Sequence, residues 1–291
     1  MRFGCCLNMI VPPGASLADG LRRLQGIGFD YAELPLARLA ALDEAGLGEV
    51  ESALRDLGLR CEACNDFLPP DLALCGPGAD VPRIRAYVRH ALERAARLQV
   101  AVVVFGSAGA RMAPPGCPPG AAHAQLAAFL ADCAPVADRL GITIAIEPLN
   151  RRECNQLTTV AAAAALCRQV AHPRIQLLVD YFHVMRTGDT TADIAAAQQL
   201  IRHVHASHPG ERRCVTRPDG DFTAFVDLLR AGGYDQRLSL EAYADEINVD
   251  GALMLAELHR LCARTPSPAQ AIPVPAGARL ARSSGPRSEQ R

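Results

Sequence analysis

The sequence predicts a single α/β domain of the (β/α)8 TIM barrel class, and three observations support this. Eight short apolar runs rich in Val, Ile and Leu recur along the chain. Longer segments with helical periodicity in Ala, Leu and Arg lie between them, as parallel strands joined by right-handed crossovers require. The chain has 291 residues, and barrels of this class commonly run to about 250.

Each predicted strand is a short run dominated by aliphatic side chains. The runs are Arg2–Leu7, Tyr31–Leu34, Arg60–Asn65, Ala101–Phe105, Ile142–Glu147, Ile175–Asp180, Arg202–His205 and Leu238–Glu241. Closing eight strands into a barrel leaves no sheet edge exposed. A doubly wound open sheet is the alternative, but it needs a glycine-rich phosphate turn after the first strand, and GCCLNMIVPPG is not one.

The connecting segments carry helix signals. Ser16–Ile27 begins with SLAD, a serine cap followed three residues later by an acid, and Gly26 and Gly28 mark its end. The other predicted helices are Val81–Leu98, Ala121–Leu140, Val160–Val170, Asp193–Leu200 and Phe222–Ala231. After Cys262 the composition changes to Pro, Ala, Ser and Arg without periodicity. We therefore expect a barrel domain over residues 1–264 and a disordered tail without catalytic function over 265–291.

Composition excludes several classes of protein. No apolar run approaches the roughly 20 residues that a membrane span needs, and the N-terminus lacks the pattern of an export signal, so we expect a cytoplasmic protein. All 30 basic residues are arginine. Without lysine, a Schiff-base enzyme, a P-loop enzyme and a pyridoxal-phosphate enzyme are excluded. The net charge of −1 without a basic cluster argues against nucleic acid as a partner.

Eleven cysteines without regular spacing suit reduced, buried thiols better than a disulfide framework. Cys61 and Cys64 do form a CEAC stretch. A zinc or redox site would need a second such pair or an exposed thiol at a strand-to-helix turn, so we interpret both residues as small core side chains.

Four successive predicted strands end on polar residues that can bind a metal ion. The fifth ends ITIAIE, the sixth IQLLVD, the seventh HVH and the eighth LSLE, which places Glu147, Asp180, His205 and Glu241 at the strand ends. In a barrel of this class the carboxyl ends of all strands share one rim, where active sites form. A single acid after a strand is most often a cap or loop residue, but three acids and a histidine at the ends of four consecutive strands form a pattern.

Three carboxylates crowded on one rim repel one another unless a cation lies between them. Oxygen-rich ligation with one imidazole favours a hard divalent ion with five or six ligands. We therefore expect a divalent metal cofactor, with Mn²⁺ the first choice and Mg²⁺ or Co²⁺ the alternatives.

These residues resemble the sugar isomerase and epimerase barrels related to xylose isomerase, in particular the ketose 3-epimerases and hydroxypyruvate-isomerase-like proteins. EPLNRRE resembles the E-x-L-N-R-x-E signature of that group, and DYFH resembles its D-x-x-H. HVHASH, the following RR, PDGDF and LSLE match in order and spacing. The resemblance covers residues 2 to 263, and its specific motifs lie in the C-terminal half.

The resemblance implies roles for individual residues. The metal ligands would be Glu147, Asp180, His205 and Glu241, and the two glutamates would also form the acid/base pair on opposite sides of the substrate carbon. Hydroxyl and carbonyl oxygens of the substrate would be bound by Glu153, His183 and Arg212, although Arg213 could replace Arg212. Taken singly, Glu153 and Arg212 would ordinarily be solvated loop charges, and His183 a capping or core residue.

The chain departs from the group at His208, where many relatives have an acid, and the following loop is one residue longer than in the epimerases, which leaves the identity of the substrate open. Because the chain has no Trp, any aromatic wall of the pocket must come from one of four residues. These are Phe67, Phe105, Phe182 and Tyr243. Gly106 and Ser107 end the fourth strand, either as a phosphate or hydroxyl contact or as a simple turn.

The expected activity is that of a metal-dependent epimerase or isomerase acting on a small ketose or hydroxy-keto acid. A metal ion on the carbonyl and the neighbouring hydroxyl would stabilise the enediolate that forms when a proton leaves the adjacent carbon. Proton return to the same carbon gives epimerisation, and return to its neighbour gives isomerisation. The alternatives are a dehydratase (lyase) acting on a keto-polyol, a non-catalytic sugar-binding barrel and, least supported, a DNA-repair endonuclease, whose metal cluster needs more histidines. The resemblance also implies a possible homo-oligomer, a dimer or a tetramer, because relatives often form one, and the sequence leaves the oligomeric state open.

Overall fold

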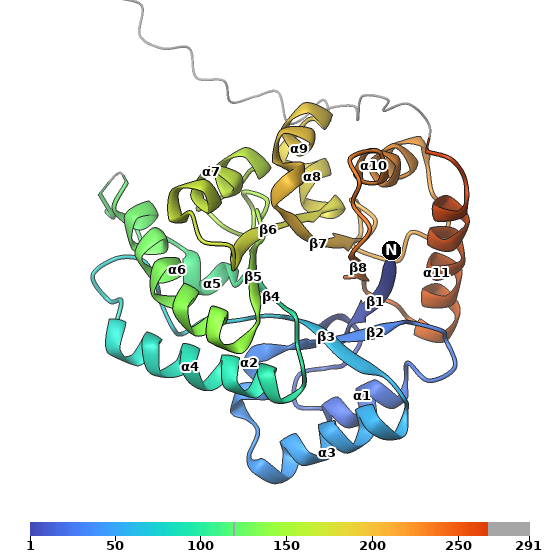
Figure 1. The fold of residues 1–291 in the computed structure, drawn as a ribbon, viewed down its shortest axis with the longest axis horizontal. Helices are drawn as coiled ribbons and strands as arrows, with labels where there is room; N and C mark the ends of the chain where they lie inside the picture. The colour runs from blue at the N-terminus through green and yellow to red at the C-terminus, as the bar shows by residue number, and fades with distance from the viewer. Residues whose placement is uncertain (119, 267–291) are drawn as a thin grey trace, which may run out of the picture.

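The computed structural model describes residues 1–118 and 120–266, and in these ranges eight parallel strands close into one barrel in sequence order (Figure 1). The predicted (β/α)8 class is confirmed, and every predicted strand end is correct to within one residue. The strands are β1 (Arg2–Cys6), β2 (Tyr31–Pro35), β3 (Arg60–Asn65), β4 (Val102–Phe105), β5 (Thr143–Ile146), β6 (Ile175–Asp180), β7 (Ile201–Ala206) and β8 (Arg237–Leu240).

Helices surround this barrel on the outside (Figure 1). The α-helices are α1 (Leu17–Arg22), α2 (Leu36–Ala41), α3 (Glu44–Asp56), α4 (Val81–Arg97), α5 (Ala108–Arg111), α6 (Ala121–Leu140), α7 (Val160–Val170), α8 (Tyr181–Thr187), α9 (Thr191–Ala197), α10 (Gly220–Ala231) and α11 (Ile247–Ala263). Short 3-10 helices η1 (Leu7–Met9) and η2 (Gln198–Leu200) follow β1 and α9.

The helix predictions differ from the structure at several places. The bounds of α6 and α7 are as predicted, whereas α1 stops at Arg22 and leaves residues 23–27 as turns. The sequence did not indicate α3 and α11, nor the short helices α2, α5 and α8. Glycines interrupt α3, and the short helices begin directly after a strand or, for α5, after two intervening residues. The predicted tail, apart from residues 265 and 266, lies outside the described residues.

Apolar side chains pack in two layers, one between strands and helices and a small one inside the barrel. The inner cluster consists of Tyr31, Ala63, Val102, Val104, Ala145 and Leu178. Gly4 pairs with Tyr31 in the sheet, and a Cβ atom at Gly4 would overlap with the Tyr31 ring. A glycine on β1 therefore lets this tyrosine fill part of the barrel interior, and the polar residues of the candidate site lie above it.

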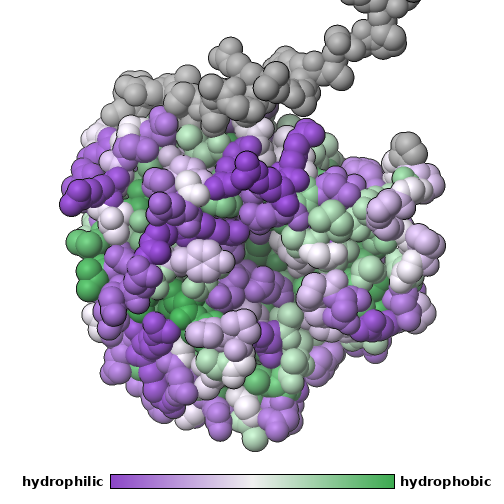
Figure 2. Space-filling view, turned by 180° about the vertical axis from the view of Figure 1, so that it is seen from behind, coloured by the Kyte–Doolittle hydropathy of each residue, from purple (hydrophilic) through white to green (hydrophobic). Residues whose placement is uncertain are grey.

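Cys61 and Cys64 are both buried, with their sulfur atoms 4.0 Å apart, as expected for core thiols. None of the helices in the described ranges is long and apolar enough to cross a membrane. The face in Figure 2 is largely hydrophilic, and strongly apolar residues show on it only in small separate areas.

Candidate active site

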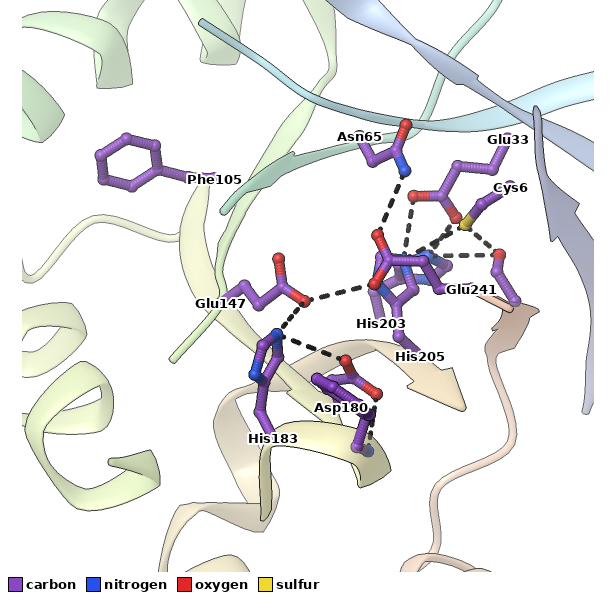
Figure 3. A network of polar contacts seen from close by, with 12 residues as sticks. Cys6, Glu33, Asn65, Phe105, Glu147, Asp180, His183, His203, His205 and Glu241 are labelled. Carbon is purple, nitrogen blue, oxygen red and sulfur yellow. Dashed lines mark hydrogen bonds and ion pairs between the residues drawn. The ribbon is translucent and has the colours of Figure 1, made fainter. Parts of the chain in front are cut away.

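The four predicted strand-end residues lie together at the carboxyl rim of the barrel, on β5, β6, β7 and β8 or directly after them (Figure 3). His205 Nδ1 is 3.5 Å from Glu147 Oε1 and 3.6 Å from Glu241 Oε2. Asp180 joins the group through His183, whose Nε2 is 3.6 Å from Asp180 Oδ2 and 3.9 Å from Glu147 Oε1. All five side chains are buried, with at most 5% of any residue exposed.

Hydrogen bonds with the backbone fix the positions of Glu147, directly after β5, and Asp180, the last residue of β6. Asp180 caps α8, because its Oδ1 accepts a hydrogen bond of 3.0 Å from the backbone N–H of Phe182. Its second oxygen therefore points away from the helix. The backbone carbonyl of Glu147 accepts a bond of 2.8 Å from the guanidinium of Arg111, which is fully buried and also donates to the Phe105 carbonyl. The end of β5 is thereby tied to the end of β4.

Gly106 provides the space that the carboxylate of Glu147 occupies, since a Cβ atom at residue 106 would overlap with Glu147 Oε2. Ser107 accepts a hydrogen bond of 3.0 Å from the backbone N–H of Leu68 and has a left-handed backbone with φ 34°. These contacts favour the simple-turn interpretation of Gly106 and Ser107 over a substrate contact.

Replacing Gly106 with Ala is expected to lower turnover by about 100-fold, because a displacement of about 1 Å in a reacting group has an effect of this size. The change adds one methyl group beside Glu147 and leaves the other site residues untouched. Steady-state kinetics on any substrate that the protein converts measures it, with Gly48→Ala as the control, since a Cβ there meets no atom within 4 Å. Equal turnover in both variants would contradict this role for Gly106.

Four buried polar atoms of the site have no hydrogen-bond partner among the described residues. They are Glu147 Oε1, Asp180 Oδ2, His183 Nε2 and His205 Nδ1. Leaving a polar atom buried and unpaired costs about 1–3 kcal/mol, and four such atoms facing one small space indicate that a ligand completes the site. The four atoms belong to two carboxylates and two imidazoles, and with Glu241 Oε2 beside His205 Nδ1 the group fits a divalent cation.

The two histidines differ in the nitrogen atom that faces this space. His183 Nδ1 accepts hydrogen bonds from the backbone N–H and the side-chain amide of Asn150, at 3.1 and 3.0 Å. A backbone N–H can only donate, so the proton of neutral His183 lies on Nε2, directed into the site. His205 has the opposite arrangement, because its Nε2 is 2.9 Å from Glu33 Oε1 and its Nδ1 faces the acids. His205 can therefore offer a lone pair to a cation, whereas His183 can donate a hydrogen bond.

Burial and mutual repulsion shift the pKa values of the acids apart. Burial, reinforced by Glu241, raises the pKa of Asp180 to about 8 and also raises that of Glu147. Burial disfavours the charge of Glu241 as well, but Arg212 and His205 hold its pKa below the ordinary carboxyl range. Glu147 and Glu241 therefore differ in proton affinity, which suits an acid and a base acting together.

The same causes set the charges of the two histidines. Burial, with Arg212 nearby, lowers the pKa of His183 to about 3, so this residue is neutral at pH 7. For His205 burial acts in the same direction, but Glu33 and Glu241 outweigh it and raise the pKa well above the usual value. A cation binding at Nδ1 would displace a proton from this nitrogen.

Arg212 covers the site from the loop after β7. Its guanidinium contacts Glu241 Oε2, lies 3.4 Å from both carboxylate oxygens of Glu153, and stacks 4.7 Å from the centre of the Phe182 ring. Its backbone is left-handed, with φ 55°, and is held by hydrogen bonds with His208 and Tyr243. Arg213 instead pairs with Asp245 outside the site. Of the two candidate arginines, Arg212 is the one that the structure brings to the acids.

Glu153 lies at the edge of the site. Its Oε1 accepts a hydrogen bond of 2.8 Å from Asn150, and its Oε2 is 3.9 Å from His183 Nε2. Its side chain is 34% exposed. Glu153, His183 and Arg212 thus form one wall, and the exposed His208 shapes the loop by accepting a bond from the Gly210 N–H.

Of the four candidate aromatic residues, Phe182 alone borders this wall. Phe67 and Phe105 are fully buried and pack on Phe129 of α6, and Figure 3 shows Phe105 pointing away from the acids. Tyr243 is 52% exposed. The expected aromatic contribution to the pocket is therefore small.

Two sets of polar residues around the site were not among the predicted site residues. Below it, Glu33, His203 and Ser239 form a buried hydrogen-bonded group inside the barrel. Beside it, Asn8, Asn65 and Asp66 lie at the ends of β1 and β3. A signal for the first set was present, since Glu33 interrupts an apolar strand and the i, i+2 spacing in HVH places both histidines on one face. No sequence signal indicated the second set.

Comparisons with known proteins identify the family and the fold of the chain. The profile of the family described as xylose isomerase-like TIM barrel matches residues 21–264. A ketose 3-epimerase of Arthrobacter globiformis is 26% identical over 264 residues, which cover 85% of each chain. An L-ribulose 3-epimerase of Mesorhizobium japonicum is 28% identical, covering 80% of this chain and 77% of the relative.

Solved structures show the same fold. The D-allulose 3-epimerase of a Methylomonas species in complex with D-allulose superimposes with a TM-score of 0.73 at 20% identity, covering 92% of this chain and 91% of the other. An L-ribulose 3-epimerase structure has a TM-score of 0.71 at 26% identity, covering 90% and 86%.

Proposed function

Because the chain belongs to the xylose isomerase-like TIM barrel family, we propose that it is a divalent-metal-dependent sugar epimerase or isomerase. It would move a proton on the carbon next to the carbonyl of a small ketose or hydroxy-keto acid. The single observation that carries the proposal is the set of unpaired buried atoms that converge from β5, β6 and β7. Two acids and two histidines with unpaired buried atoms would destabilise a purely structural core.

The chemistry of the donors identifies the residues that would hold the metal. Carboxylate oxygens of Glu147, Asp180 and Glu241 and the Nδ1 lone pair of His205 form an oxygen-rich set, which Mn²⁺, Mg²⁺ or Co²⁺ accepts. Mn²⁺ is the first choice. A bound ion would stabilise the negative charge that develops on a substrate oxygen when the neighbouring carbon loses its proton.

The protein would supply the proton transfer itself. Glu147 follows β5 and Glu241 follows β8, so they approach the middle of the rim from different parts of the barrel. In a substrate between them, one glutamate removes a proton from one face of a carbon and the other returns one to the opposite face, which inverts that carbon. Return to the neighbouring carbon would give an isomerase instead.

The wall formed by His183, Arg212 and Glu153 would orient the substrate. Neutral His183 directs its Nε2–H into the site, where a carbonyl or hydroxyl oxygen can accept it. Arg212 provides a fixed positive charge, and Glu153 can accept a hydrogen bond from a hydroxyl group. These contacts would hold the reacting carbons at the two catalytic glutamates, and correct orientation accounts for a large part of enzymatic rate acceleration.

The opposite side of the site favours an uncharged sugar over a hydroxy-keto acid. Asn65 Nδ2 lies 3.3 Å from Glu241 Oε1 and donates a bond of 2.8 Å to Asn8, which donates one of 3.1 Å to Asp66. Asp66 is exposed and has no salt bridge to any of the described residues. An exposed carboxylate beside the site repels an acid or a phosphate and accepts hydrogen bonds from hydroxyl groups.

Replacing Asp66 with Asn is expected to lower kcat/KM for an uncharged ketose by about 10-fold, because a hydrogen bond to a charged group contributes about 1.5–3 kcal/mol. The same change is expected to raise kcat/KM for a hydroxy-keto acid or a phosphorylated ketose relative to the sugar. Asp56→Asn on the exposed side of α3 is the control. Unchanged selectivity between charged and uncharged substrates would contradict the assignment.

A panel of ketoses and hydroxy-keto acids, incubated with the protein and Mn²⁺ in D2O, tests the proposed function. We expect deuterium to enter an uncharged ketose next to its carbonyl, detected by NMR before the product is identified. An unsaturated product from a cyclic ketone would indicate a dehydratase instead. Failure of the purified protein to bind any divalent metal would indicate a barrel that only binds sugar.

A further inference from the structure

Glu33 is a carboxylate buried inside the barrel, in the middle of β2 and on the other side of His205 from Glu147 and Asp180 (Figure 3). The residue is 0% exposed. An ionised carboxylate in such a place is destabilising unless hydrogen bonds and opposite charges compensate for lost hydration. None of its ion pairs among the described residues involves an arginine. Its contacts therefore have to explain why an acid occupies this position.

Three donors converge on the two oxygens of Glu33. Oε1 is 2.9 Å from His205 Nε2, and Oε2 is 2.7 Å from His203 Nε2 and 2.6 Å from Ser239 Oγ. Ser239 is in turn 2.8 Å from the Tyr31 hydroxyl. The carboxylate is held from both sides, so it cannot rotate without breaking these hydrogen bonds.

We propose that Glu33 is a positioning residue that orients His205 for metal binding. As an acceptor at 2.9 Å, it keeps the proton of His205 on Nε2 and turns Nδ1 toward Glu147 and Glu241. A carboxylate behind a histidine ligand also makes the imidazole a stronger donor to the metal. The proposal rests on the proposed function, since it concerns the ion that function requires.

Other partners of His205 explain its orientation less well. Cys6 Sγ is 3.9 Å from the same Nε2, and a buried thiol is a weak acceptor at that distance. A second cation among Glu33, His203 and His205 has no space, because direct hydrogen bonds of 2.7 and 2.9 Å already join these side chains.

Glu33→Gln tests the proposal with little change in size. A carboxamide offers one acceptor oxygen to three donors, so its NH2 group faces at least one former donor. Ser239→Ala is the matched control, because it removes a contact of Oε2 and leaves the bond from His205 to Oε1 in place. Metal-free protein is titrated with Mn²⁺ for the wild type and both variants, and urea unfolding of each metal-free form reports on the fold.

We expect Glu33→Gln to weaken Mn²⁺ binding by 10- to 100-fold, in the range known for carboxylates behind histidine ligands, and Ser239→Ala to weaken it by less than about 3-fold. Equal affinity of Glu33→Gln and the wild type would overturn the proposal, as would an equal loss in both variants. Wild-type protein that binds no Mn²⁺ would instead refute the proposed metal-dependent function, so the two failures are distinguishable.

A measurement on the unmodified protein covers the case in which Glu33→Gln does not fold. In ¹⁵N-histidine-labelled wild type with Mg²⁺, we expect the NMR spectrum to show His205 protonated at Nε2 and unprotonated at Nδ1. A proton on Nδ1 of the Mg²⁺-bound protein would overturn the proposed orientation.

Discussion

Glu147→Gln and Glu241→Gln are each expected to reduce deuterium exchange into every active ketose by at least about 1000-fold, since removing a general base alone costs about 10²–10⁴-fold. Each glutamate combines two proposed roles, because its carboxylate both accepts the substrate proton and contributes to the metal site. Glutamine keeps the shape of the side chain and removes its charge and basicity. The buried position of both residues means that no solvent molecule readily replaces the lost base.

The measurement is proton NMR of the ketose in D2O, started separately from each epimer. Glu211→Gln, an exposed acid on the same loop as Arg212, is the control and should retain wild-type exchange. The metal content of each variant is measured in parallel, which separates the loss of a base from the loss of the ion. Exchange at the wild-type rate in either active-site variant, with metal bound, would refute the acid/base assignment.

Removing the metal is expected to make stability depend on pH between 6 and 8. Burial and Glu241 raise the pKa of Asp180 to about 8 in the folded, metal-free protein, whereas the unfolded carboxyl has its ordinary value of 3.8. The folded state therefore holds a proton that the unfolded state has released. The stability that this proton contributes is present at low pH and is lost as the pH rises through the folded pKa.

For a single group the loss amounts to about 2 kcal/mol between pH 6 and pH 8. Burial also raises the pKa of Glu147, which acts in the same direction. A saturating divalent ion compensates the charges of the acids, so we expect the metal-bound protein to show little dependence on pH in this range.

Urea unfolding at pH 6, 7 and 8, with a chelator or with Mn²⁺, measures how the free energy of unfolding changes with pH in each form. Asp180→Asn is the matched variant, because the amide keeps the cap of α8 through its oxygen but does not titrate. In the metal-free form of this variant, the free energy of unfolding should change less with pH than in the metal-free wild type. The variant should also gain little stability from Mn²⁺. The same slope with and without metal in the wild type would contradict the expected coupling.

Local patterns account for the parts of this protein that could be predicted. Runs such as ITIAI and IQLLV are strands because both faces of a parallel strand in a barrel are buried, which requires nearly continuous apolar sequence. An acid or histidine that ends such a run lies on the carboxyl rim, so Glu147, Asp180, His205 and Glu241 could be grouped before any contact was known. Helices such as α3 were missed because Gly46 and Gly48 weaken the local signal.

The partners of these residues depend on contacts between distant segments. Glu33 and His205 are 172 positions apart, and Asn65 and Glu241 are 176 apart, so no local spacing relates them. The choice between Arg212 and Arg213 depends on a left-handed backbone at Arg212, which the two adjacent arginines do not indicate. The sequence likewise indicates only a turn at Gly106, because the carboxylate of Glu147 that occupies the space beside it comes from a distant position in the chain.

The sequence by itself determined the barrel class, the strands and which acids lie on one rim, because periodicity and strand direction are local properties of the chain. Only the tertiary structure decided which histidine nitrogen faces the acids, which arginine covers them and which carboxylate lies behind His205. The last of these outcomes depends on the closed barrel, which brings β7 and β8 within hydrogen-bonding distance of β2 and β3 across its interior. IEPLNRRE thus marks the acid that follows β5, and Arg111 and Gly106 after β4 determine how that acid is held.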